Sequence, residues 1–148
     1  MKSILITALG LLCLSLVAIA SENEATATAI FQKAIDECKS LDEGEFGSTE
    51  KSTTLQDLTG DGRPEQIVDA SQFSCSSAAS LWGGSGGTYL WVIVDGKAYE
   101  FLAHRWKVVD IYGQNLLLLA VHSSECGDTI GPCYRAVVWG DEGFRTIR

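Results

Sequence analysis

Hydrophobic residues near the start of the chain recur every three or four positions, from residue 27 to residue 41. This spacing is typical of one face of an α-helix that packs against the rest of a domain. The residues on this face are Ala27, Ile30, Phe31, Ala34, Ile35, Cys38 and Leu41. Ser21 or Asn23 is the expected N-cap, which places acidic residues in the first turn and Lys39 in the last, in accord with the helix dipole.

Beyond the helix, the pattern changes to short runs of β-branched and aromatic residues separated by Gly, Asp and Asn. Such runs predict strands, and strands that follow one another in sequence pair antiparallel by default. Residues 88–94 are apolar almost throughout, which predicts a central strand buried on both faces, and Asp95 and Gly96 then predict a hairpin turn. The predicted strands are 53–56, 65–71, 88–94, 98–104, 106–112, 116–122, 134–139 and 144–147.

Residues 42–52 and 72–87 are rich in glycine and small polar residues, so we expect them to be loops. The fold class predicted from these patterns is α+β. It is mainly antiparallel β, with about eight short strands and one N-terminal amphipathic helix packed on the sheet.

The first 20 residues have the features of a secretory signal peptide. Lys2 supplies a positive charge, residues 4–17 form an apolar run, and residues 18–20 read small-x-small before the expected cleavage point. The run is short for a membrane span, and polar residues follow it directly. We therefore expect a signal peptide at 1–20 and a single exported domain at 21–148, periplasmic or secreted and without a membrane segment after cleavage.

The cysteine count predicts disulfide bonds. Cys13 lies in the predicted signal peptide, and an even number of cysteines in an exported domain is typical of a disulfide framework. The remaining four are Cys38, Cys75, Cys126 and Cys133. Three pairings are open, but the last two bracket a short loop containing Gly and Pro and can close locally, which leaves Cys38 with Cys75.

The chain is acidic, with a formal net charge of −8 that becomes −9 when Lys2 leaves with the signal peptide. No cluster of Lys and Arg is present, which disfavours nucleic-acid binding because phosphate groups would be repelled. The charged partners that this balance favours are cations and basic protein surfaces. The sequence names no individual ligand or protein partner.

Oxygen-bearing side chains alternate along the segment that joins the first two predicted strands. Gly60 and Gly62 let this segment turn sharply, and hard cations such as Ca²⁺ take six to eight oxygen ligands. The candidate metal ligands are the side chains of Asp57, Thr59, Asp61 and Glu65 and the carbonyl oxygen of Arg63. The alternative is a metal-free turn in which Asp57 and Asp61 accept hydrogen bonds from backbone N–H groups.

Residues 57–65 resemble the D-x-N-G-D-G-x-x-D loop of FG-GAP and VCBS-type secreted β proteins, which joins two strands and often holds Ca²⁺. Thr59 stands where that family usually has Asn or Asp, and Glu65 stands where it has Asp. The family repeats the motif around a propeller, whereas this chain has one copy. The resemblance implies a structural Ca²⁺ site and no activity.

A looser resemblance covers most of the chain after the predicted signal peptide. The order of the loop, Phe73-Ser74-Cys75, a glycine-rich segment and a tryptophan-containing strand is similar to small exported bacterial proteins of unknown function. The glycine-rich segment contains G-x-S-x-G around Ser85, but a nucleophile elbow needs a strand before it and a helix after it, and here a strand follows. No residue is therefore predicted to be catalytic.

The chain contains four tryptophans. Residues of this type are expected either to pack in the core or to form an exposed aromatic patch for sugar or protein contact. The function that we expect is an exported, non-catalytic binding or structural module. The alternative is a cell-envelope inhibitor or immunity-type protein that blocks a secreted enzyme. A third hypothesis is a small hydrolase that uses Ser85 or carboxylates that the sequence does not single out.

Overall fold

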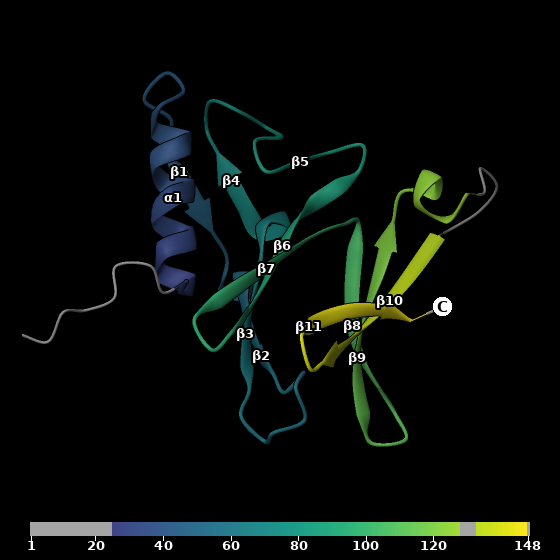
Figure 1. Ribbon diagram of the computed structural model, residues 1–148. Coiled ribbons are helices and arrows are strands. Elements are labelled where there is room, and N and C mark those ends of the chain that lie inside the picture. Colours follow the sequence, from purple (N-terminus) through teal and green to yellow (C-terminus); the bar gives the residue numbers. More distant parts are fainter. Residues whose placement is uncertain (1–24, 128–132, 148) are drawn as a thin grey trace, which may run out of the picture.

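The computed structural model describes residues 25–127 and 133–147. The predicted signal peptide at residues 1–20 lies outside this range. In the described part, one α-helix packs on antiparallel β-sheets that are held by two disulfide bonds (Figure 1). The predicted fold class is confirmed. No described helix is long and apolar enough to cross a membrane.

All eight predicted strands are present, within two or three residues of their expected ends. The helix is α1 (Ala27–Lys39), and the strands are β1 (Phe46–Ser48), β2 (Thr53–Gln56), β3 (Glu65–Asp69), β4 (Phe73–Cys75), β5 (Gly83–Gly84), β6 (Gly87–Val94), β7 (Lys97–Ala103), β8 (Arg105–Ile111), β9 (Gln114–Val121), β10 (Cys133–Gly140) and β11 (Gly143–Ile147). Short 3₁₀ turns cover Glu50–Ser52, Ala70–Gln72 and Ser123–Cys126. Three of these strands, β1, β4 and β5, lie in segments expected to be loops.

Two sheets face each other (Figure 1). In one, β6 is central, with β3 and the short β5 along one edge, β7 along the other, and β2 outside β3. The other has the order β8-β9-β10-β11. The chain passes from one sheet to the other between β7 and β8, at His104, whose N–H donates to the Ala120 carbonyl oxygen at 2.7 Å.

The main core lies between the two sheets, and β6 shows how the sequence positions it. Leu90, Val92 and Val94 point into this core, whereas Tyr89 and Trp91 lie on the opposite face of the strand. This alternation is the two-residue period of a β-strand. The prediction of a central strand is confirmed. Its burial on both faces is only partly met, because Tyr89 and Trp91, on the face away from the main core, are half-buried.

Helix α1 lies against the opposite face of the β6 sheet over a second, smaller core. Ala34 and Cys38 are buried there, and Phe31 joins an aromatic cluster with tilted and edge-to-face contacts at 5.1–6.3 Å between ring centroids. The other members of the cluster are Phe46, Phe73 and Trp82. This cluster explains β1 and β4, because their pairing brings two of its phenylalanines under the helix.

The predicted start of the helix is wrong. Thr26, not Ser21 or Asn23, is the N-cap, and its Oγ1 accepts a hydrogen bond from the Ala29 N–H at 3.1 Å. The first turn therefore contains no acidic residue, although Lys39 does lie in the last turn. Ile35 and Leu41, predicted to lie on the buried face, are more than one-third exposed.

Both predicted disulfides are confirmed, Cys38–Cys75 and Cys126–Cys133. The first ties α1 to β4, so the helix is bonded covalently to the aromatic cluster beneath it. The second joins the end of the last 3₁₀ turn to the start of β10.

Candidate functional site

The acidic loop, residues 57–65, joins β2 to β3 at one end of the sheet. Gly60 and Gly62 have φ of 80° and 82°, in the left-handed region that the sequence predicted for them. Leu58 points away from solvent into the main core. The loop is therefore anchored through its own apolar side chain, while Asp61 and Arg63 remain at the surface.

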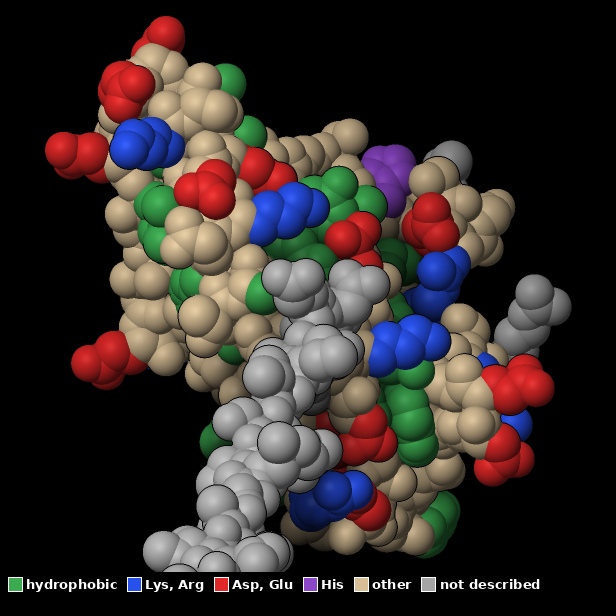
Figure 2. Space-filling view, turned by 60° about the vertical axis from the view of Figure 1, so that its left-hand side comes forward, with side chains coloured by type: hydrophobic (Ala, Val, Ile, Leu, Met, Phe, Trp, Pro, Cys, Tyr) green, Lys and Arg blue, Asp and Glu red, His purple; other side chains and the backbone are tan. Residues whose placement is uncertain are grey.

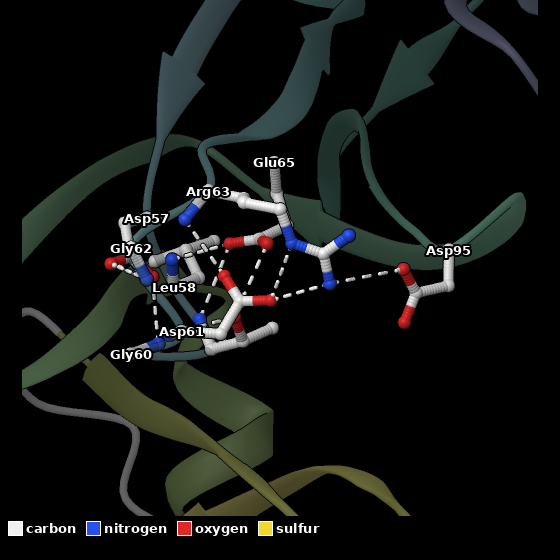
Figure 3. Close-up of polar contacts among 9 residues, drawn as sticks. Asp57, Leu58, Gly60, Asp61, Gly62, Arg63, Glu65 and Asp95 are labelled. Atoms are coloured by element: carbon white, nitrogen blue, oxygen red, sulfur yellow. Dashed lines mark hydrogen bonds and ion pairs between the residues drawn. The ribbon is translucent and has the colours of Figure 1, made fainter.

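The carboxylates of Asp57, Asp61 and Glu65 come together in this loop, with oxygen atoms within 4.8 Å of one another (Figure 3). Both oxygens of Asp57 face the backbone of the turn. Oδ1 accepts a hydrogen bond from the Gly60 N–H at 2.6 Å, and Oδ2 accepts one from the Gly62 N–H at 3.0 Å.

Asp61 is bound by Arg63, the residue two positions later. The Arg63 backbone N–H donates to Oδ1 at 2.8 Å, and its Nε and Nη2 donate to Oδ2 at 2.9 and 2.7 Å. The backbone hydrogen bond and then the side-chain bonds lower the pKa of the exposed Asp61 carboxyl below its usual value. Asp61 in turn raises the pKa of the Arg63 guanidinium. Arg63 Nη2 also lies 3.9 Å from Asp95 Oδ1 (Figure 3).

Glu65 is the buried member of the cluster, with 8% of its surface exposed. Its Oε2 accepts hydrogen bonds from the backbone N–H groups of Leu58 at 2.5 Å and Thr59 at 3.2 Å. The Thr59 hydroxyl donates to Oε1 at 3.3 Å. Glu65 thus holds the first half of the loop against the start of β3.

Each of the six carboxylate oxygens in the cluster therefore accepts a hydrogen bond from within the loop. These carboxylate oxygens are the kind of ligand that Ca²⁺ requires. In this structure, however, backbone N–H groups, one hydroxyl and one guanidinium of the loop already donate hydrogen bonds to them. Arg63, predicted to offer a carbonyl oxygen, contacts the cluster through its side chain, which supplies the positive charge beside Asp61. The calcium site stays a prediction.

Ser85 lacks the geometry of a nucleophile elbow. It lies with Gly86 in the two-residue turn between β5 and β6, so a strand follows it. It lines a cleft of about 600 Å³ that also contains His122. The imidazole of His122 binds instead to Ser124, with Nδ1 at 2.8 Å from Oγ, in a local contact that caps the following 3₁₀ turn.

A second candidate site is a groove of about 420 Å³ between α1 and the β6–β7 hairpin, referred to below as the aromatic groove. The helix leaves this part of the sheet uncovered. The side chains that line the groove come from α1 (Ile30, Lys33, Ala34 and Glu37), from the segment before β5 (Leu81 and Trp82) and from the hairpin (Tyr89, Trp91, Ala98 and Glu100). Figure 2, which brings the α1 side forward, shows hydrophobic side chains bordered by acidic and basic ones on this face.

Stacked aromatic rings form the sheet side of the aromatic groove. Tyr89 and Trp91 lie two residues apart on the outer face of β6, with ring centroids 5.5 Å apart and an angle of 21° between planes. Both are only half-buried. The opposite side is formed by one face of α1, so a bound group would contact apolar surface on two sides.

Each side of the aromatic groove also carries a carboxylate held by an indole. Trp82 Nε1 donates to Glu37 Oε2 at 2.9 Å, and Trp91 Nε1 donates to Glu100 Oε2 at 3.0 Å. Trp91 and Glu100 are direct cross-strand partners in the β6–β7 ladder. Lys33 is the only cationic residue among those lining the groove, and its Nζ lies 3.7 Å from Glu37 Oε1.

This groove was not predicted from the sequence, although an exposed aromatic patch was one expected use of the tryptophans. One wall could have been found from the sequence. The two-residue turn predicted at Asp95 and Gly96 sets the register of the hairpin and places Trp91 opposite Glu100. The other wall depends on how α1 docks.

No protein-family model, curated protein or solved structure matches this chain. The resemblance of residues 57–65 to the FG-GAP loop therefore rests on those nine residues alone.

Proposed function

We propose that this protein is a non-catalytic binding module whose ligand site is the aromatic groove. The observation that carries the proposal is the half-exposed stack of Tyr89 and Trp91 on a sheet face that α1 covers only in part. Aromatic side chains with one buried and one accessible side are enriched in binding sites, because they give up much apolar surface to a ligand at a small cost in conformational entropy.

The groove is also built in advance of any ligand. The hydrogen bonds from Trp82 to Glu37 and from Trp91 to Glu100 fix the two indoles and the two carboxylates. The Cys38–Cys75 bond holds the helical wall in place. Because little side-chain freedom remains to be lost, binding in such a groove costs less entropy than binding at a mobile surface.

The acidic loop has a structural part in this proposal. It closes the end of the β2–β3 hairpin, and Leu58 fills the main core while Glu65 accepts the two backbone hydrogen bonds beside it. Ca²⁺, the cofactor suggested by the resemblance of the loop, would add to this structural role. The loop lies in a different part of the fold from the aromatic groove and shares none of its lining residues.

We further infer that the protein works outside the reducing cytosol, in the periplasm or as a secreted protein. The two disulfides support this location, since such bonds persist in oxidising compartments. The sequence of residues 1–20 supports it independently. N-terminal sequencing of the protein recovered from a fractionated cell tests both points: mature chain starting at Ser21 is expected, and a Met1 start in the cytosol would contradict them.

The four tryptophans provide the test of the groove. Each indole N–H gives its own signal in a ¹H–¹⁵N correlation spectrum, assigned by replacing each tryptophan with phenylalanine. We expect a panel of a basic peptide, an acidic peptide and a neutral oligosaccharide to contain at least one ligand that shifts the signals of Trp82 and Trp91. Trp106 and Trp139 lie outside the groove and serve as internal controls.

A ligand that shifts only the control signals would contradict the proposed site, as would a panel in which nothing shifts any of them. Tyr89→Ala is the confirming variant, because it removes half of the aromatic stack and leaves both indole–carboxylate pairs in place. Any true groove ligand should bind this variant at least about tenfold more weakly, in line with the loss of a large aromatic contact.

A further inference from the structure

We propose that the aromatic groove binds an arginine side chain presented by a basic segment of a partner protein. This inference rests on the proposed function, because it names the ligand chemistry of the same groove. Three features carry it: the charge balance of the lining residues, the half-buried aromatic stack, and the carboxylate of Glu100, which has no ion-pair partner among the described residues.

The groove is net negative. Glu37 and Glu100 are opposed by one cation, Lys33, which lies 3.7 Å from Glu37 and has a highly exposed side chain. Among the described residues no ion pair reaches Glu100. In the described part of the chain, the only hydrogen-bond partner of the Glu100 carboxylate is the neutral indole of Trp91. This bond fixes the carboxylate but leaves its charge unbalanced.

An aromatic face next to an unbalanced carboxylate favours a cation. The faces of Tyr and Trp rings carry partial negative charge and attract ammonium and guanidinium groups within about 6 Å. Glu100 lies directly opposite Trp91 across the β6–β7 ladder, so a cation placed over the indole would also reach the carboxylate. The acidic chain as a whole would guide a basic partner toward this face.

Arginine fits this arrangement better than lysine. Its guanidinium is planar, stacks on aromatic faces and offers five N–H donors in a fixed geometry that matches carboxylate oxygens. With Glu100 Oε2 bound to Trp91, Glu100 Oε1 remains for a donor in the groove, whereas Glu37 Oε1 already lies 3.7 Å from Lys33 Nζ. The apolar side chains of Ile30 and Ala98 line the groove where the methylene groups of arginine would lie.

The test uses the mature disulfide-bonded protein and a blocked glycine pentapeptide with a central arginine. Binding is followed by the indole signals of Trp82 and Trp91. The matched ligand is the same peptide with citrulline, which keeps the shape and planarity of arginine and lacks its charge. We expect the arginine peptide to bind at least about tenfold more tightly than the citrulline peptide, and the lysine peptide to fall between them.

Two substitutions change the charge of the groove in opposite directions. Glu100→Gln keeps an oxygen that can accept from Trp91 Nε1 but removes the charge, so we expect at least about tenfold weaker binding of the arginine peptide. Lys33→Ala removes the competing cation and should tighten binding severalfold. Glu142→Gln, at an exposed position in the β10–β11 turn, makes the same change in net charge and should leave the affinity unchanged.

Equal binding of the arginine and citrulline peptides would overturn this inference, and so would unchanged affinity in Glu100→Gln. A neutral oligosaccharide or an acidic peptide that shifts Trp82 and Trp91, with no shift from the arginine peptide, would overturn it while leaving the groove as the binding site. If the arginine peptide shifts only Trp106 or Trp139, both the ligand and the site are wrong.

Discussion

The side-chain amide of Asn115 donates a hydrogen bond to the backbone carbonyl oxygen of Asp57 at 2.6 Å, across 58 positions of sequence. Asn115 belongs to β9 and Asp57 begins the acidic loop, so this bond ties the loop of one sheet to a strand of the other. Together with buried Leu58, it makes the loop a joint between the two sheets.

The first prediction concerns this joint. Asn115→Ala removes the donor and leaves the Asp57 carbonyl oxygen without this partner, so we expect the free energy of unfolding to fall by about 1 kcal/mol. Asn115→Asp should cost more, because a carboxylate cannot donate and would face a carbonyl oxygen. Urea denaturation followed by tryptophan fluorescence measures both. Equal stability of the three proteins would show that the sheets are joined by apolar packing alone.

Glu65 is expected to matter more to stability than any other acidic residue of the loop. Glu65→Ala leaves the N–H groups of Leu58 and Thr59 without their acceptor, and we expect a loss of about 1–3 kcal/mol. Glu65→Gln keeps one oxygen and should lose less. Gln66→Ala, at the exposed next position, is the matched control and should change stability by less than about 0.5 kcal/mol. A control as damaging as Glu65→Ala would contradict the assignment.

Asp61 makes the stability of the loop depend on pH. Its pKa is lower in the folded protein, because the Arg63 backbone N–H and guanidinium favour the carboxylate. The stabilisation is therefore fully present above the ordinary pKa of 3.8 and is lost as pH falls through the lowered folded value. We expect Asp61→Asn to lower the melting temperature at pH 7, and this difference to shrink as the pH falls from 3.8 toward 2. A difference that stays constant between these pH values would rule out this carboxylate as the cause.

The calcium prediction has a direct thermal test. A loop that binds Ca²⁺ only when folded raises the melting temperature as the ion is added to dialysed protein. Asp61→Ala should abolish the rise. Arg63→Ala should enlarge it, because the guanidinium that now binds Asp61 would no longer compete with the ion. An unchanged melting temperature in Ca²⁺, with Na⁺ at matched ionic strength as the reference, would leave the loop as the metal-free turn.

The two disulfides should contribute unequally. The chain-entropy estimate gives about 4 kcal/mol for Cys38–Cys75, which closes 37 positions of sequence, and about 2.5 kcal/mol for Cys126–Cys133, which closes seven. Replacing each pair with alanine and measuring urea denaturation tests this order. Only the first replacement should also move the Trp82 and Trp91 indole signals, because only that bond holds a wall of the aromatic groove. The reverse order of losses would contradict the entropic account.

Local patterns were sufficient for most of the fold. The two-residue and three-to-four-residue periods of the apolar side chains located eight strands and the helix, and the left-handed turns at Gly60, Gly62 and Gly96 follow from glycine chemistry. The strands β1 and β4 were not predicted, because three residues are too few to show a two-residue period. Their pairing is decided by the packing of Phe46 and Phe73 under the helix, which no local window contains.

The start of the helix shows a similar limit. Ser21, Asn23 and Thr26 are all good N-cap residues, so the choice among them depends on the surroundings. The Ala25 N–H donates to the Gly96 carbonyl oxygen at 2.6 Å, which holds this residue beside the β6–β7 turn just before the helix begins. This hydrogen bond between Ala25 and Gly96 therefore links the residue before the N-cap to the hairpin on the other side of the groove.

The acidic loop was predictable in composition and less so in its contacts. Asp57, Thr59, Asp61 and Glu65 lie together in the loop, and their use as metal ligands stays a prediction. It does not reveal that the Arg63 side chain folds back onto Asp61, because a long exposed side chain has many rotamers and its choice depends on neighbours such as Asp95.

The bond between Cys38 and Cys75 has a consequence for how the two walls of the aromatic groove are held together. In the reduced chain, α1 would be held by its apolar contacts and by two hydrogen bonds, Trp82 to Glu37 and Ala25 to Gly96. Ala34 is the only other buried residue of the helix. Without the covalent bond, the helical wall would be held less firmly beside the hairpin. We therefore expect formation of this disulfide to fix the distance between the two walls of the groove.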